Sequence, residues 1–283
     1  MLRSRNAGRR WQSIPVVIDP FFTADWIEAL AINPGDPLDL YAAVGSGIAH
    51  SSDGGRSWSF SDAEECSFVN SITVDPSSPS RYAGGTPVEI HGCSLHCNAF
   101  VSRDGGRNWD CLPLDEAIDT EALDPVKSST IYAGGAHFAD GAHLWKSIDG
   151  GRSFVSPASA PSHVVSLAVS PVARRIVYAG TQESGVFRSA DAGRHWSPAS
   201  SGLPPGAVGS LVADPLEPAT VYAGIRQKGV FRSRDGGATW QPLGEGLPVQ
   251  LFLGTLSLAS GDHRTLYAGT AGAGAFALAI FDL

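Results

Sequence analysis

Short runs of apolar residues, each bounded by glycine, proline or polar residues, recur along the whole chain. Between residues 164 and 197 four such runs cover 164–169, 176–180, 185–188 and 195–197. Runs of this length with turn residues between them are typical of β-strands. The pattern therefore predicts four short strands in this period of the chain.

Two sequence signatures repeat with the same period. The second of the four runs carries Tyr-Ala-Gly or a close variant, with a mean spacing of about 45 residues, which is in the range of propeller blades. The third run is followed by Ser-x-Asp-x-Gly-x-x-Trp or a variant of it. The signature tyrosines are Tyr41, Tyr82, Tyr132, Tyr178, Tyr222 and Tyr267.

Six repeats of four strands predict an all-β fold, a six-bladed β-propeller of four-stranded antiparallel blades, with residues 1–283 as one domain. The chain starts with a box and the strand after it, whereas the last repeat ends at Leu283 without a box. We therefore expect residues 4–13 to pair with the strand at 274–278 and to complete the last blade, which would hide the sheet edges. A seventh blade is expected only if the chain is truncated.

The repeated box has the composition of a tight turn between the third and fourth strands. An Asp side chain can accept hydrogen bonds from backbone N–H groups two or three residues on, and glycine adopts the positive φ that the turn needs. The aromatic residue at its end can then bury a large apolar area between sheets. We expect a structural role for the box residues Asn6, Asp53, Asp104, Asp149, Asp191 and Asp235.

The box, with Val-Tyr-Ala-Gly-Thr at 177–181 and Gly-Val-Phe-Arg-Ser at 185–189 before it, resembles the BNR or Asp-box repeat superfamily. That superfamily includes sialidases, xyloglucan-cleaving hydrolases, sortilin-type receptors and photosystem II assembly factors. The resemblance implies the propeller fold, which hosts many activities. Sialidases share an Arg-Ile-Pro motif near the start, but here Ser13 precedes Ile14-Pro15. The active site of the xyloglucan hydrolases lies between two propellers. The repeats of this chain predict only one propeller, so that cleft is missing.

The candidate ligand site lies in blades one to three. Aligned on Tyr-Ala-Gly, the innermost strands match Glu28, Asn70 and Asp119 in these blades, but Val165, Gly209 and Gly254 in blades four to six. Carboxylates beside an indole could accept hydrogen bonds from sugar hydroxyls or ligate a hard cation. The alternative is that they are solvated loop carboxylates of an acidic protein. The candidate ligand-binding residues are Asp25, Trp26, Glu28, Glu65, Asn70 and Asp119.

The four cysteines lie close together in the sequence, in or beside blade two. They are Cys66, Cys93, Cys97 and Cys111, and an even, local set of this kind favours two disulfides and an oxidising compartment. We expect Cys66 to pair with Cys93 or Cys97, and Cys111 with the other one. Free thiols are one alternative, and a zinc site is another, because residues 91–97 offer two His and two Cys.

Composition excludes several classes of partner and leaves two functions. The net charge of −8 and the pI of about 5.4 argue against nucleic acid and anionic lipid, and no apolar stretch is long enough to span a membrane. We expect a secreted or periplasmic monomer without a metal, cofactor or catalytic residue, which binds a protein or glycan ligand. The alternative is a glycoside hydrolase that uses the acidic face. A third class, photosystem II assembly factors, would predict an arginine-rich face.

Overall fold

A computed structural model describes the chain in two compact units. The first comprises residues 1–137 and 147–155, and the second comprises residues 138–146 and 156–283. The residues that the structure does not describe are 5, 7–9, 20–21, 24–25, 63–66, 88–96, 115, 136–143, 244–251, 260–264, 272–273 and 281–283.

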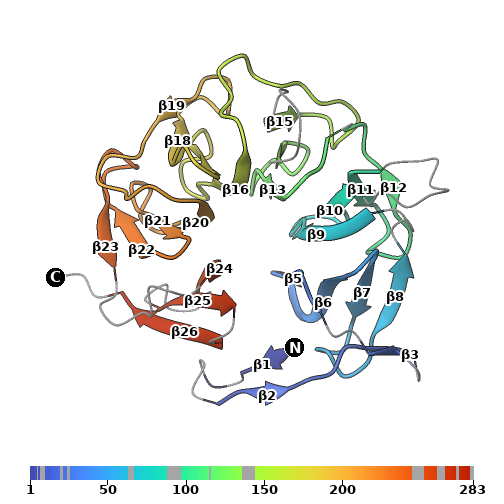
Figure 1. The fold of residues 1–283 in the computed structure, drawn as a ribbon. Coiled ribbons are helices and arrows are strands. Elements are labelled where there is room, and N and C mark those ends of the chain that lie inside the picture. The colour runs from blue at the N-terminus through green and yellow to red at the C-terminus, as the bar shows by residue number, and fades with distance from the viewer. Residues whose placement is uncertain are drawn as a thin grey trace. The chain divides into compact units, whose positions relative to one another are not determined.

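The described residues form six successive antiparallel sheets of three or four strands, one for each repeat (Figure 1). No helix is present among them. The predicted all-β, six-bladed propeller is confirmed as the fold class. In blade order the sheets are β5(Ala29–Asn33)-β6(Asp36–Val44)-β7(Gly47–Ser51)-β8(Ser59–Asp62), β9(Ser67–Val74)-β10(Arg81–Pro87)-β11(Ala99–Ser102)-β12(Asp110–Cys111), β13(Thr120–Leu123)-β14(Ile131–Gly134)-β15(Leu144–Ser147), β16(Val164–Val169)-β17(Val177–Thr181)-β18(Val186–Ser189)-β19(Ser197–Pro198), β20(Val208–Ala213)-β21(Val221–Ile225)-β22(Gly229–Ser233)-β23(Gln241–Leu243) and β24(Phe252–Leu258)-β25(Thr265–Ala271)-β26(Gly274–Ala279).

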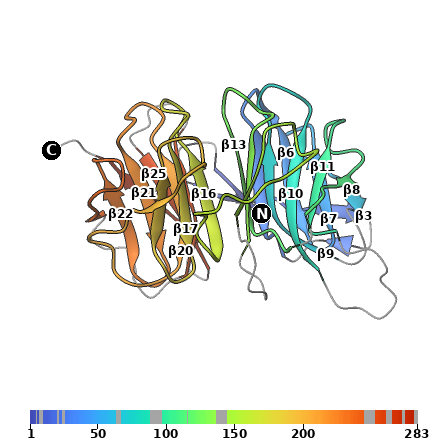
Figure 2. The ribbon, with the colours of Figure 1, turned by 90° about the horizontal axis from the view of Figure 1, so that it is seen from above.

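The core lies between neighbouring sheets within each unit. In the second unit, strands of blades four and five lie side by side (Figure 2), and a cluster that includes Tyr178, Leu211 and Trp240 fills the space between them. In the first unit, Tyr41 and Ala83 belong to an equivalent cluster between blades one and two. The Tyr-Ala-Gly strand supplies much of this core, because its small residues allow the sheets to approach each other.

The boxes fold as hydrogen-bonded turns that are more elaborate than the sequence predicts. In the first full copy, Asp53 Oδ1 accepts hydrogen bonds from the N–H groups of Arg56 and Ser57, and from Ser51 Oγ. Asp53 Oδ2 accepts a further bond from Ser57 Oγ at 2.7 Å. The position four residues after each Asp supplies this side-chain donor in all five Asp boxes, through Ser57, Asn108, Ser153, His195 and Thr239.

These hydrogen bonds hold the pKa of each box aspartate below its usual value. The first causes are the side-chain or backbone bonds from the residue four positions on, and for Asp235 they lower the pKa to about 2. The aromatic residues after the boxes are buried at Trp196 and Trp240 and partly buried at Trp58 and Trp109. The structural role of the boxes follows from these bonds.

The N-terminus contains a strand pair that the sequence analysis did not predict. β2(Gln12–Ser13) pairs with β1(Leu2–Arg3), with Arg3 opposite Gln12. Blade five has the same register, in which Arg232 lies opposite Gln241. The first fourteen residues therefore repeat a third strand, a box and a fourth strand, in which 12–13 pairs with 2–3. The pairing of residues 4–13 with 274–278 stays a prediction. A second short pair, β3(Val17–Asp19) and β4(Phe22–Thr23), precedes blade one.

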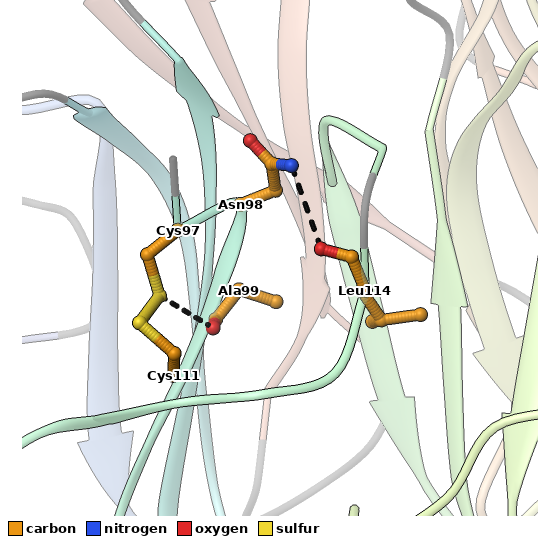
Figure 3. Close-up of a disulfide and its surroundings, with 5 residues drawn as sticks. All are labelled: Cys97, Asn98, Ala99, Cys111 and Leu114. Carbon is orange, nitrogen blue, oxygen red and sulfur yellow. Dashed lines mark hydrogen bonds between the residues drawn. A yellow bond between two sulfur atoms is a disulfide. The ribbon is translucent and has the colours of Figure 1, made fainter. Parts of the chain in front are cut away.

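One disulfide is described, between Cys97 and Cys111 (Figure 3). The two Cα atoms are 5.6 Å apart, and the bond joins the entry of β11 to β12. Next to it, Asn98 Nδ2 donates to the Leu114 carbonyl oxygen at 3.4 Å. Cys66 and Cys93 lie outside the described residues. The predicted disulfide of Cys111 with one of the pair Cys93 and Cys97 is confirmed, and the zinc set of residues 91–97 loses Cys97 as a thiolate ligand.

Candidate functional site

Glu28 and Asp119 directly precede the innermost strands β5 and β13 of the first unit, and Asn70 lies within β9, the innermost strand between them. The backbone N–H groups of Glu28 and Asp119 donate to equivalent carbonyl groups, Ala43 O at 3.1 Å and Gly134 O at 2.8 Å. Asn70 lies in β9 at the bulge opposite Gly84 and Gly85. Because β9 contacts both β5 and β13, the backbone brings these positions to one edge of the three blades. We call Glu28, Asn70 and Asp119 the polar row.

The exposure of these residues differs. Trp26 is 78% exposed, and Glu28 is exposed beside it, whereas Asn70 and Asp119 are partly buried. Asp25 and Glu65 lie outside the described residues. An indole with this much free surface, two residues from an exposed carboxylate, is available to a ligand.

A further carboxyl group, Glu121 of β13, lies two residues beyond Asp119 in the interface between blades two and three. Its Oε2 accepts a hydrogen bond from Ser71 Oγ of β9 at 2.7 Å. Its Oε1 is buried and has no hydrogen-bond partner within the part of the chain that the structure describes. Its backbone carbonyl accepts from Thr73 Oγ1 at 3.2 Å, so both ends of the residue contact β9.

Glu121 stands where the other five blades have an aliphatic side chain. In each sheet the alanine after the signature tyrosine pairs with one residue of the innermost strand. Of these residues, Ile72, Leu211 and Leu256 pack against the preceding blade of the same unit. The six residues at this position are Leu30, Ile72, Glu121, Leu167, Leu211 and Leu256.

The serine that contacts Glu121 also belongs to a repeated pattern. In blades four and five the equivalent residues, Ser166 and Ser210, bond to the backbone of the next blade, at Val208 O (2.6 Å) and Leu256 N (2.9 Å). In blade two, Ser71 bonds to the carboxyl group of Glu121 instead. The contact between blades two and three thus depends on a titratable side chain.

The environment of Glu121 favours its neutral form. Burial raises its pKa from 4.5 to about 7; the hydrogen bond from Ser71 opposes this shift, and the nearby charge of Asp119 adds to it. A carboxyl group with this pKa changes its charge near neutral pH.

A second polar cluster, which the sequence also did not reveal, joins blades one and two. Arg81 Nη2 donates to Asp39 Oδ2 at 3.0 Å, and His50 Nε2 lies 2.7 Å from Asp39 Oδ1. The Arg81 guanidinium lies over the ring of Tyr41, 4.9 Å from its centre, and that ring stacks on His50. Burial would raise the pKa of Asp39, but hydrogen bonds, that from Asn33 foremost, keep it below the usual value.

Two further observations limit the chemistry of the described residues. They contain no group of three or more His, Cys, Asp or Glu side chains placed to hold a metal ion. They also contain no helix that is long and apolar enough to cross a membrane.

Comparison with solved structures identifies the fold. The chain is similar to the GH74 enzyme of Niastella koreensis (TM-score 0.69, 18% identity) and to the GH74 xyloglucanase from Xanthomonas campestris (TM-score 0.68, 19% identity), covering 89% of this chain and 44% of either enzyme. It therefore spans less than half the length of those enzymes.

The chain is also similar to YCF48 bound to D1 peptide, with a TM-score of 0.61 and 15% identity over 95% of this chain and 84% of that one. No protein-family model and no curated protein matches the sequence. At these identities the likeness concerns the fold alone. The chain has the β-propeller fold that these proteins share.

Proposed function

We propose that this chain is a non-catalytic propeller that binds a positively charged segment of another protein along the polar row. The observation that carries the proposal is the asymmetry of the innermost strands. Glu28, Asn70 and Asp119 occupy matching positions of three consecutive innermost strands, whereas the matching positions of blades four to six are Val165, Gly209 and Gly254.

The chemistry of the row supports a cationic ligand. The carboxylates of Glu28 and Asp119 can pair with Lys or Arg side chains, and the exposed face of Trp26 can hold a cation or an aromatic ring. The chain is acidic overall, with a net charge of −8, which would speed the encounter with a basic partner.

One structural neighbour supports a protein ligand, because it was solved with a bound peptide. This chain covers 84% of a YCF48 that was solved with a peptide, but only 44% of the GH74 enzymes. The likeness in fold does not show that this chain binds the same peptide. The carboxylates of the polar row favour a positively charged ligand.

The glycoside hydrolase alternative needs a carboxylic acid that can reach a glycosidic oxygen. Glu121 has the raised pKa of such an acid, but its Oε1 is buried and its Oε2 is bonded to Ser71. This geometry favours a role inside the protein over proton transfer to a substrate.

The proposed location is outside the cytoplasm. The disulfide between Cys97 and Cys111 is the observation behind it, because structural disulfides persist in oxidising compartments.

The experiment is a selection of random twelve-residue peptides displayed on phage against the immobilised chain. We expect the recovered peptides to be rich in Lys and Arg, and their binding to fall in Glu28→Gln and Asp119→Asn but not in the exposed control Glu183→Gln. Neutral or acidic peptides, or equal binding by all variants, would contradict the proposal. Release of sugar from xyloglucan or chromogenic glycosides would establish the hydrolase instead.

A further inference from the structure

Three oxygen atoms converge beside Gly84 of β10, in the interface between blades two and three. Around the point where a Cβ of residue 84 would stand lie Ser71 Oγ and the Ile118 carbonyl oxygen, both 2.7 Å away, and Glu121 Oε1. Glycine at this position lets the carboxyl group of Glu121 approach the backbone of blade two.

An ionised Glu121 does not suit this place. A carboxylate only accepts hydrogen bonds, and Oε1 has no donor among the described residues, while the Ile118 carbonyl oxygen shares the space beside Gly84 with it. A neutral carboxylic acid keeps the bond from Ser71 and offers a hydrogen of its own to a neighbouring acceptor. The interface therefore fits the protonated side chain.

Among the described residues that pack against Glu121, we find no cation paired with its carboxyl group. β9 contributes Ser71 and Thr73, and its described sequence holds no ionisable side chain. β10 carries Arg81, but that guanidinium is paired with Asp39. The segment before β13 brings Asp119, whose negative charge disfavours a second one.

We propose that Glu121 is a proton-operated switch between blades two and three: it packs against β9 as a neutral acid, and when it loses its proton to solvent the contact between β9 and β13 loosens. The switch lies two residues from Asp119, so ionisation acts directly on one end of the polar row. A hydrogen bond across the same interface, from Ile118 N–H to Gly85 O at 3.1 Å, reports on the contact.

The switch also links protons to the ligand, and this step rests on the proposed function. A cation bound at Asp119 removes the repulsion that favours neutral Glu121, so binding would release a proton. By reciprocity, raising the pH through neutrality would strengthen the binding of a cation.

The switch is tested without a ligand on the whole chain. In protein labelled with ¹³C-glutamate, the carboxyl resonance of Glu121 should titrate near pH 7, and a midpoint between 4 and 5 would overturn the proposal. Hydrogen exchange of the Ile118 amide, corrected for its intrinsic pH dependence, should become about 30-fold faster between pH 5.5 and 8.5, as expected for a pKa that falls from about 7 to 4.5 on opening.

Variants separate a switch from a passive contact. Glu121→Gln keeps the shape without a charge, and its Ile118 exchange should not change with pH, whereas Glu183→Gln should behave as wild type. If Glu121→Gln does not fold, Glu121→Leu restores the residue of the other blades and serves the same purpose. The amide of Leu256, bonded across blades five and six to Ser210, is the internal control. The same pH response in Glu121→Gln would refute the switch.

Hexalysine serves as the probe for the ligand step. Calorimetry at pH 6.5 in buffers of different ionisation enthalpy should show proton release by wild type and Glu183→Gln and none by Glu121→Gln. Binding without proton release would refute the linkage. Absence of binding would refute the basic-ligand function, whereas the titration and the exchange data would still decide the switch.

Discussion

Replacing Arg81 by valine tests whether the ion pair between blades one and two depends on the burial of both partners. Arg81 and Asp39 have side chains that are only 5% and 14% exposed. At the position of Arg81 the other blades carry buried aliphatic residues: Leu40, Ile131, Val177, Val221 and Leu266. Arg81→Val thus inserts the residue type that the repeat favours but leaves Asp39 buried without its cation.

The magnitude follows from the cost of an unpaired buried charge. Removing one partner of a buried pair typically costs about 3 to 5 kcal/mol, whereas exchanging the whole group for residues that pack well is often neutral or stabilising. Asp39 keeps hydrogen bonds from Asn33 and His50. We therefore expect a loss near the lower end, about 3 kcal/mol, for Arg81→Val.

The matched variant transplants the residues of blade five. Thr220, Val221 and Arg232 of that blade correspond to Asp39, Arg81 and His50. The triple variant Asp39→Thr, His50→Arg, Arg81→Val should recover most of the loss. Urea unfolding at pH 7, followed by fluorescence and extrapolated to water, measures each free energy. A loss below about 1 kcal/mol for Arg81→Val, or a triple variant no better than the single one, would refute this reasoning.

Three other predictions concern the disulfide and a box. Loss of the Cys97–Cys111 bond, which spans a sequence separation of 14, should cost about 3 kcal/mol by the loop-entropy estimate, measured as a lower urea midpoint for Cys111→Ser in an unreduced sample. Trp240→Ala should cost about 3 to 5 kcal/mol, because the indole is 4% exposed and donates to the Ala199 carbonyl; full stability would contradict it. The folded-state pKa of Asp235 is lowered to about 2, so its contribution is complete above pH 4 and is lost as the pH falls toward 2. Asp235→Asn should lower the melting temperature at pH 7 and match wild type near pH 2.

The repeat pattern predicted the fold because each blade places the same residue types at the same strand positions. The second strand, the box and the aromatic residue after it recur closely enough to define blades and turns. The sequence could not reveal the side-chain donor four residues after each box aspartate, because that position varies among Ser, Asn, His and Thr. What these residues share is a hydrogen-bond donor, and this becomes visible only in the folded turn.

The polar row was predicted at the level of backbone position. Alignment on Tyr-Ala-Gly placed Glu28 and Asp119 at equivalent positions of their blades. Their equivalent backbone hydrogen bonds support that alignment. Glu121 was missed because only loop residues were considered for function, whereas it lies inside a strand. Its signal was present in the sequence, as the one acidic residue at a position that is Leu or Ile in five blades.

The pairing of residues 2–3 with 12–13 was missed because the repeat was matched only from the box onward. Leu2-Arg3-Ser4 has the sequence pattern of Phe231-Arg232-Ser233, which precedes the box of blade five. Extending the comparison by three residues would have predicted the hairpin.

Locating a bound peptide on the protein by NMR would show most directly whether the polar row binds a cationic segment. Backbone amide resonances of the whole chain would be recorded with and without the tightest peptide from the phage selection. We expect the largest shifts at Glu28, Asn70 and Asp119 and at the indole of Trp26. Shifts confined to the boxes, with the polar row unchanged, would contradict this expectation.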